Sequence, residues 1–275
     1  MQEFFAAKHL VNPKTKENIE SFVCDHMNHG KWKVVLQFVA GLLNSSSDIF
    51  TKLLPKPNEG EWPATKKDKD LAVQVCKCLH EINDEQQPVL QNKMEKINFN
   101  EVDFSSCSLE PFDVAAVLHF LENAKEVFSI DLSDNNFGDL GANEVKKFIF
   151  KRELNLKRLD LSRNNLTNKA AKDFASALQR INRKLESLDL GGNNFTDSVA
   201  KGFAEALEHS NCKLRKLYLS ERKFTDNAAK VFAAALGHSN CKLEWLLLSR
   251  KRFTNEGCQY LSDAGNKSNC HVLFL

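Results

Sequence analysis

The stretch Leu185-Glu186-Ser187-Leu188-Asp189-Leu190-Gly191-Gly192-Asn193-Asn194-Phe195 decides the fold of this 275-residue chain. It follows the pattern L-x-x-L-x-L-x-x-N-x-L, in which leucines and an asparagine recur at set positions. A period of constant length predicts a solenoid of stacked repeats, because one such unit cannot bury its apolar face alone. The same frame begins, at steps of 28 and then 29 residues, at Phe99, Val127, Leu156, Leu185, Leu214, Leu243 and Val272.

Each repeat divides into a strand and a helix. Apolar and polar residues alternate in the first part, as at Leu188 and Leu190, which is the period of a β-strand. In the second part apolar residues recur on one face of a helix, and one such stripe is Val199, Ala200, Phe203, Ala204 and Leu207. N-cap residue types precede the last four helices, at Thr167, Thr196, Thr225 and Thr254.

These patterns predict an α/β leucine-rich-repeat horseshoe over residues 99–275, with parallel strands inside the curve and helices outside. Asn135, Asn164 and Asn193 stand where the chain turns out of each strand, and an amide there can both donate to and accept from the backbone. We expect a structural role for them. Arg222 and Lys251 replace asparagine in later repeats and should point outward.

Residues 1–98 lack the repeat and predict a small all-α domain. The segment Lys33–Leu43 is apolar nearly all round, so we expect it to be buried. A helical stripe follows at Leu71, Val75, Leu79 and Ile82. Between the two, the Pro-rich and polar stretch 54–70 predicts a loop.

Three segments of this first part resemble the NLR family, the innate immune sensors that combine a NACHT module with leucine-rich repeats. They are Gln2-Glu-Phe-Phe-Ala-Ala7, Trp32-Lys-Val-Val-Leu-Gln-Phe-Val-Ala-Gly-Leu-Leu43 and Leu53-Leu-Pro55. They are similar to the helical segment between the NACHT module and the repeats, and the repeats are similar to the ribonuclease-inhibitor type of that family. The chain departs from the family in having no phosphate-binding loop, since its Gly30-Lys31 is followed by Trp32. ATP binding is therefore not carried over.

Net charge, apolar runs and cysteine usage indicate the cellular location of the protein and the classes of partner to expect. The net charge is +2, which implies no obligatory nucleic-acid or membrane partner. No apolar run approaches the roughly 18–20 residues that span a bilayer. Most of the eight cysteines stand alone and three share one repeated position, which favours buried reduced thiols and a cytoplasmic protein: Cys212, Cys241 and Cys270.

Chemistry-bearing residues do not form a convincing active site in the sequence. Cys24, His26 and His29 make one short triplet, and Cys76, Cys78 and His80 make another. Thiolate and imidazole suit zinc, but neither spacing matches a known finger pattern. We therefore expect no catalytic residues, no metal and no cofactor, and a zinc-dependent enzyme is the most distant alternative.

The side chains between the strand leucines should face solvent on the concave side, where a partner would bind. The first repeats place aspartates there and the last two place aromatic and apolar residues, an exposed cluster typical of interaction hot spots. Basic residues also gather late in the chain and could attract an acidic partner or nucleic acid, but the nearby acids Glu221, Asp226 and Glu244 favour a solvated rim. The candidate partner-binding residues are Arg158, Asp160, Asp189, Lys216, Tyr218, Trp245, Leu247 and Arg250.

The sequence thus predicts a protein-binding scaffold. The resemblance implies the ligand-sensing or autoinhibitory portion of an NLR-type receptor, and a free-standing scaffold of ribonuclease-inhibitor type is the alternative. We expect a protein partner on the concave face and neither membrane nor nucleic acid as a partner. The chain ends in Val272-Leu273-Phe274-Leu275, partway into a strand, so the open edge should favour self-association.

Overall fold

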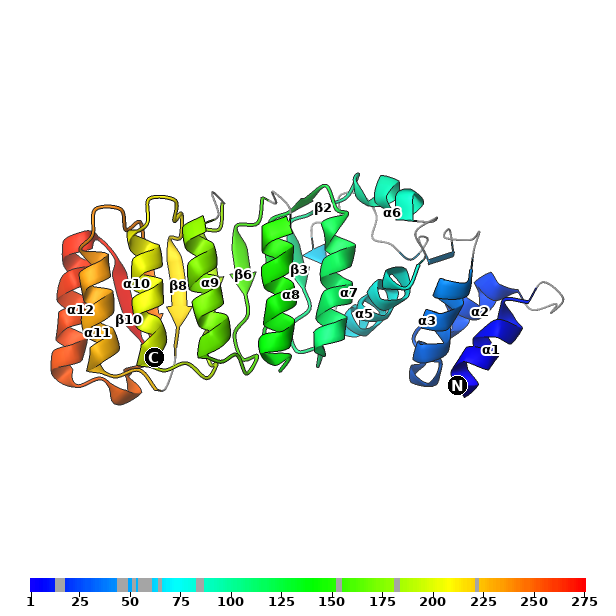
Figure 1. The fold of residues 1–275 in the computed structure, drawn as a ribbon, viewed down its shortest axis with the longest axis horizontal. Coiled ribbons are helices and arrows are strands. Elements are labelled where there is room, and N and C mark those ends of the chain that lie inside the picture. The colour runs from blue at the N-terminus through cyan, green and yellow to red at the C-terminus, as the bar shows by residue number, and fades with distance from the viewer. Residues whose placement is uncertain are drawn as a thin grey trace. The chain divides into compact units, whose positions relative to one another are not determined.

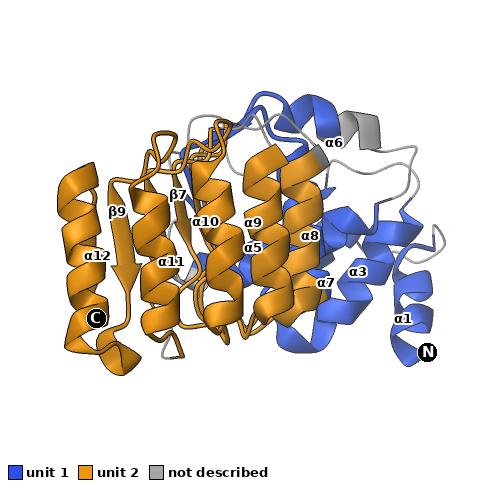
Figure 2. Ribbon diagram, turned by 60° about the vertical axis from the view of Figure 1, so that its left-hand side comes forward, with its two compact units in different colours: residues 1–103, 112–127 blue, residues 104–111, 128–275 orange. Residues whose placement is uncertain are grey.

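The computed structural model describes residues 1–12, 18–43, 49–50, 53, 61–63, 66–82, 87–151, 155–180, 184–220 and 223–275. It divides into two compact units, coloured separately in Figure 2. Unit 1 comprises Met1–Asp103 and Phe112–Val127, and unit 2 comprises Phe104–Pro111 and Phe128–Leu275. The helix of the first repeat therefore groups with the N-terminal region, and a domain boundary between residues 98 and 99 stays a prediction.

The N-terminal region is mostly helical in the residues described, but the strand at Glu61–Trp62 departs from the predicted all-α domain. Its helices are α1 (Gln2–Leu10), α2 (Ile19–His26), η1 (Gly30–Trp32), α3 (Lys33–Leu42), α5 (Lys66–His80), α6 (Gln87–Met94) and α7 (Pro111–Glu122). Two pairs of short parallel strands complete unit 1: β1 (Glu61–Trp62) with β3 (Glu101–Asp103), and β2 (Asn98–Phe99) with β4 (Glu126–Val127). Residues 54–60 of the expected loop lie outside the described residues.

Two expectations for this region are wrong in detail. The expected loop ends earlier, because α5 already begins at Lys66. Lys69 of its first turns forms a 2.6 Å ion pair with Asp103, a contact that the local sequence does not reveal. Helix α3 is not buried all round: it buries Val35, Leu36, Val39 and Ala40 but leaves Val34 50% and Phe38 38% exposed.

Unit 2 contains one parallel sheet with helices along one of its faces (Figure 1). The strands follow chain order: β5 (Ser129–Asp131), β6 (Arg158–Asp160), β7 (Ser187–Asp189), β8 (Lys216–Leu219), β9 (Trp245–Leu248) and β10 (His271–Phe274). The helical segments between and after them are α8 (Gly138–Lys151), α9 (Asn168–Arg180), η2 (Asp197–Val199), α10 (Ala200–Glu208), α11 (Asp226–Leu236), η3 (Arg250–Arg252) and α12 (Asn255–Ser268). This is the predicted α/β leucine-rich-repeat architecture.

The register confirms the 29-residue frame at every step of this sheet but the last. Leu188 pairs with Leu159 on one side and with Leu217 on the other. The frame expected Val272 opposite Leu243, but Val272 pairs with Leu246, so the final step is 26 residues. The displacement follows from the end of α12, where Asn269 adopts a left-handed conformation (φ 57°) and turns the chain into β10 early.

The core of unit 2 lies between the strand leucines and the helices. Leu190 and Phe203 are 0% exposed, and the helix stripes bury small alanines that let each helix approach the sheet closely. The three predicted asparagines form a ladder of hydrogen bonds that runs from one repeat to the next. The Oδ1 atom of Asn164 accepts from the backbone N–H groups of Asn135 and Asn136, both at 3.0 Å, and its Nδ2 donates to the Leu132 carbonyl at 2.8 Å.

The asparagine ladder confirms a structural role for Asn135, Asn164 and Asn193, because each amide satisfies backbone groups of its own and the preceding repeat. The ladder ends where other residues replace asparagine in the later repeats. Lys251 is exposed, as expected for a cation at this position. Arg222, for which the same was expected, lies outside the described residues.

A second ladder joins the starts of the helices. The threonines predicted as N-caps do cap at three helices, since Thr167, Thr225 and Thr254 accept from backbone N–H groups in the next turn. Each also donates backwards to the previous repeat. Asp226, for example, accepts from the Thr254 backbone N–H at 2.9 Å and from its hydroxyl at 2.6 Å. The caps therefore also fasten neighbouring repeats together.

Candidate functional site

The open face of the unit 2 sheet is the side that the helices leave uncovered. Along β6 and β7 the middle residue of each strand is buried and its neighbours are not, so the residues on either side of it form this face. Strand pairing aligns these residues into two rows across the sheet. The first row is Ser129, Arg158, Ser187, Lys216, Trp245 and His271, and the second is Asp131, Asp160, Asp189, Tyr218, Leu247 and Leu273.

The first half of the second row carries three half-buried carboxylates: Asp131, Asp160 and Asp189. Each Oδ1 accepts the backbone N–H two residues further on, at 2.8 to 2.9 Å, where the chain leaves the strand. Burial raises the pKa of Asp189 to about 6, with the charges of Asp160 and Asp131 adding to the effect. Burial also raises the pKa of Asp160. These aspartates therefore shape the strand ends in addition to any part in binding.

The second half of the open face carries Lys216, Tyr218, Trp245 and Leu247, as the alternation predicts. All four are half-buried, so the cluster is less exposed than the sequence predicts. Trp245 is covered in part by His271 on the adjacent strand, since the centroids of their rings lie 4.6 Å apart. Burial together with the nearby Asp189 carboxylate raises the pKa of the Tyr218 phenol.

Two grooves run along this face. The open-face groove, of about 480 Å³, is lined by Arg158, Lys216 and Tyr218 among others. A second groove, of about 1240 Å³ at the strand ends, is lined by Asp189, Leu247 and Arg250 among others. Of the eight candidate residues, Asp160 and Trp245 line neither. Arg250 is exposed in η3 and donates to the Asn255 side chain at 3.2 Å.

A third groove, which we call the strand-entry groove, has a volume of about 810 Å³ and lies where the chain enters the strands. Sequence reasoning missed it, although its lysines recur at the 29-residue period. Among its lining residues are Phe128 and Asn155. The charged residues that line it are Lys157, Lys184, Glu186, Lys213, Arg215, Lys242 and Glu244.

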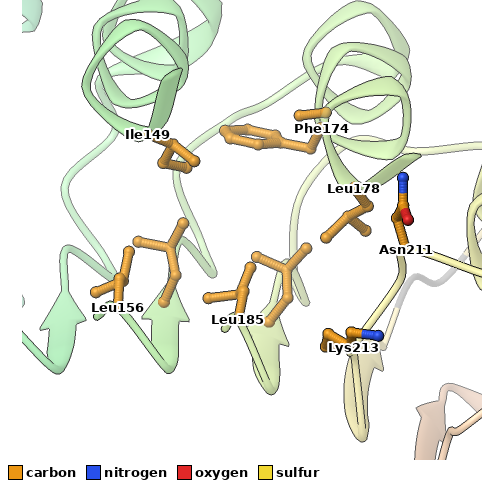
Figure 3. A pocket seen from close by; sticks show the side chains of 10 residues that line it. Ile149, Leu156, Phe174, Leu178, Leu185, Asn211 and Lys213 are labelled. Carbon is orange, nitrogen blue, oxygen red and sulfur yellow. The ribbon is translucent and has the colours of Figure 1, made fainter. Parts of the chain in front are cut away.

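A small, mostly apolar cavity of unit 2 is best explained as a packing gap. It lies between the helices and the sheet, where Ile149, Phe174 and Leu178 face Leu156 and Leu185 (Figure 3). Its volume is about 30 Å³. Since one water molecule already needs about 10–15 Å³, this space is too small for a substrate.

The two cysteine–histidine triplets are not assembled into metal sites. Cys24 is exposed, and the His26 ring stacks on Phe22 with 4.3 Å between ring centroids. Cys76 and Cys78 are buried free thiols, and burial raises the pKa of Cys78 to about 12. No group of three or more potential ligands gathers within the described residues.

The repeated thiols fit their expected structural role in part. Cys212 and Cys270 are buried, whereas Cys241 is half-buried. Burial raises the pKa of all three, which keeps them as thiols at neutral pH. Within the described residues, no helix is long and apolar enough to cross a membrane.

Comparison with known proteins identifies the repeat. The family model described as Leucine Rich repeat matches residues 129–144, 154–175 and 182–204, which include strands β5, β6 and β7. No curated protein matches the sequence. One similar solved structure is the tropomodulin C-terminal domain of Caenorhabditis elegans, with 10% identity and a TM-score of 0.40, over 72% of this chain and 92% of that chain. The chain thus contains leucine-rich repeats, arranged as strands on one side and helices on the other.

Proposed function

We propose that this chain is a protein-binding scaffold that holds its partner on the open face of the unit 2 sheet. Leucine-rich repeats are a protein-binding architecture. The observation that carries the proposal is the half-buried set Lys216, Tyr218, Trp245 and Leu247, which the register of β8 and β9 places side by side. Aromatic anchors beside a cation are the residue types that dominate binding energy at protein interfaces.

The test uses the two tyrosines of the chain, which lie on different surfaces. Tyr218 is on the open face, while Tyr260 is 45% exposed on α12. A photo-crosslinking amino acid at position 218 should trap a partner in cells of the source, and the same amino acid at position 260 should not. The trapped protein is then identified and its binding to the purified chain is measured.

The double substitution Tyr218→Ala with Trp245→Ala should weaken that binding by at least about 2 kcal/mol. Tyr260→Ala is the matched control and should leave the affinity unchanged. Equal affinities of the double variant and the wild type would place the binding site elsewhere, for instance on the helices.

A finer proposal is that the chain is the ligand-sensing or autoinhibitory portion of an NLR-type receptor, with residues 1–98 as the helical domain ahead of the repeats and the cytoplasm as its location. The three segments beginning at Gln2, Trp32 and Leu53 support it by resemblance. An immunoblot of source cells against the repeat region decides between this and the alternative. A band well above 31.2 kDa supports a receptor, and a band at 31.2 kDa supports a free-standing scaffold of ribonuclease-inhibitor type.

Self-association is proposed through β10, the last strand in the order of the sheet. Within the described residues no further strand pairs with the outer side of β10, and an unpaired strand edge is a template for pairing. Sedimentation velocity over a range of protein concentrations should then show a growing dimer fraction. A monomer at every concentration would refute this contact.

A further inference from the structure

The strand-entry groove is built from two rows of side chains that repeat from strand to strand. The pairing row is Lys157, Glu186, Arg215 and Glu244, and the lysine row is Lys184, Lys213 and Lys242. Backbone bonds hold the pairing row in register, since the Glu186 N–H donates to the Lys157 carbonyl at 2.9 Å and the Arg215 N–H to that of Glu186 at 2.8 Å. Successive members of each row are therefore about 4.8 Å apart.

The pairing row satisfies its own charges. Nζ of Lys157 lies 4.0 Å from Oε1 of Glu186, and the Arg215 guanidinium forms an ion pair with the Glu244 carboxylate. The row thus alternates in sign across four repeats and leaves no net charge. It also lines the open-face groove, so it forms the border between the two grooves.

The lysine row has no such compensation. Lys184 donates to the amide oxygen of Asn155. Lys213 and Lys242 make no ion pair with an acidic side chain in the part of the chain that the structure describes. Instead they face each other, and the Lys242 ammonium lowers the pKa of Lys213. Exposed like charges at this spacing oppose each other, which is a cost that an anionic ligand would relieve.

The strand-entry groove therefore carries a local excess of positive charge. Among the lining side chains that the structure describes, five are basic and two are acidic. Arg158 and Lys216 lie on the adjoining open-face groove and add to the same field. Such a patch speeds the arrival of an anionic partner and selects against cationic ones.

We propose that the strand-entry groove binds an acidic polypeptide segment, with the lysine row contacting its carboxylates. Three inter-strand steps from Asn155 to Lys242 span roughly 15 Å, which matches two or three same-side residues of an extended chain at about 6.8 Å each. The acids Glu186 and Glu244 remain available as acceptors for backbone N–H groups of the segment. This surface is separate from the aromatic set of the proposed open-face site.

The same features disfavour a nucleic acid. Single-stranded nucleic acids are bound by stacking bases on several aromatic side chains, but Phe128 is the one aromatic among the described residues that line this groove. Glu186 and Glu244 would also face a continuous chain of phosphates. An acidic peptide, whose charges are spaced and whose backbone donates hydrogen bonds, fits the mixed lining better.

The chain offers a matched control for the lysine row. Lys172, Lys201 and Lys230 are exposed on the helices α9, α10 and α11, at the same 29-residue period. A triple lysine-to-glutamine change there removes the same number of charges, at the same period of the sequence, on another surface. Circular dichroism melting of both triple variants establishes that each is folded.

The experiment measures fluorescence anisotropy of labelled dodecapeptides with the full chain. A peptide of alternating glutamate and serine should bind at low salt and weaken as ionic strength rises to about 0.15 M, because exposed charge pairs are screened. Lys184→Gln/Lys213→Gln/Lys242→Gln should weaken this binding by about tenfold, since each exposed pair contributes little alone. Lys172→Gln/Lys201→Gln/Lys230→Gln should leave it unchanged, and a glutamine–serine peptide should not bind.

Three results would overturn the proposal: no binding of the glutamate peptide, equal losses in the two triple variants, or tighter binding of an oligothymidylate of the same length through the lysine row. Either of the first two results would mean that the lysine row does not bind acidic peptides. The third result would mean that it binds nucleic acid. The Tyr218→Ala/Trp245→Ala variant should still bind the glutamate peptide. Because this variant should keep its affinity for the glutamate peptide, the peptide assay tests the strand-entry groove independently of the open-face proposal.

Discussion

Asp189 is a residue whose position in the sheet changes its chemistry. Its carboxylate lies in a row with Asp160 and Asp131 on adjacent strands, and it accepts the Gly191 N–H at 2.8 Å. Burial first, and the neighbouring carboxylates second, raise its pKa from 3.8 to about 6. Folding therefore makes ionisation of Asp189 less favourable than it is in the unfolded chain, even though the local hydrogen bond holds the side chain in place.

This pKa sets a pH dependence of stability. Because the folded state binds the proton more tightly than the unfolded state, the contribution of Asp189 is present below pH 3.8 and is lost as the pH rises to about 6. Asp189→Asn should remove that loss and stabilise the protein at pH 7 by on the order of 1 kcal/mol, a figure reduced for partial solvent screening. Urea unfolding at several pH values measures it. Asp263→Asn, at an exposed position of α12, is the matched control, and a destabilised Asp189→Asn at pH 7 would contradict the argument.

At the scale of the element, the helices of unit 2 begin at threonines that also bond to the preceding repeat. Helix α12 shows how tightly this contact is built. Asp226 accepts two hydrogen bonds from Thr254, and Thr254 in turn accepts from the Gly257 N–H at 3.2 Å. A Cβ added at Gly257 would lie 2.0 Å from Oδ1 of Asp226. The glycine is therefore required by packing between repeats and not by its backbone angles.

Gly257→Ala should destabilise the protein by about 1 kcal/mol, because the loss of the Asp226–Thr254 contact outweighs the higher helix propensity of alanine. In an Asp226→Ala background the clash is absent, so the same substitution should be neutral or stabilising. Thermal or urea unfolding of the four proteins in this cycle gives the coupling. Equal costs of Gly257→Ala in both backgrounds would show that the ladder is not the cause.

At the scale of the whole molecule, stacking makes the repeats of unit 2 depend on one another. Each repeat contributes one strand and the following helical segment, and its leucines are buried against neighbours on both sides.

The net charge of the whole molecule differs from the charge of its local surfaces. The chain carries only +2 overall, yet five basic side chains and two acidic ones line the strand-entry groove. The net charge of the chain therefore does not reveal the basic surface on which we expect an anionic partner.

Leu190→Ala tests this cooperativity, because Leu190 is 0% exposed and lies just after β7. It should cost about 2–5 kcal/mol, the range for a buried leucine truncated to alanine. The transition followed by fluorescence of Trp245, two strands away on β9, should shift together with the circular dichroism signal of the protein. Trp32→Phe and Trp62→Phe are introduced beforehand so that only Trp245 reports. A shift in circular dichroism with none in Trp245 fluorescence would mean that the repeats unfold separately.

Much of this fold could be predicted from the sequence, for a physical reason. A side chain that must be buried in every repeat recurs in the sequence, so the leucine and asparagine positions reveal the strands, the helices and the ladder at Asn164. The caps at Thr225 and Thr254 follow similarly from residue type. Alternation alone predicts that Tyr218 and Trp245 lie on the open face, and the strand pairing confirms this position.

Only the tertiary structure decided the contacts between repeats. The 26-residue step into β10 depends on how α12 ends, which the leucine pattern does not encode. The half-burial of Trp245 depends on the ring of His271 beside it, and the raised pKa of Asp189 depends on burial and on carboxylates 29 residues away or more. The unpaired charge of the lysine row appears only when Lys157 and Arg215 are seen paired with glutamates of the next repeat. Local sequence determines where an element lies, whereas burial and charge at each position depend on the neighbours that stacking brings to it.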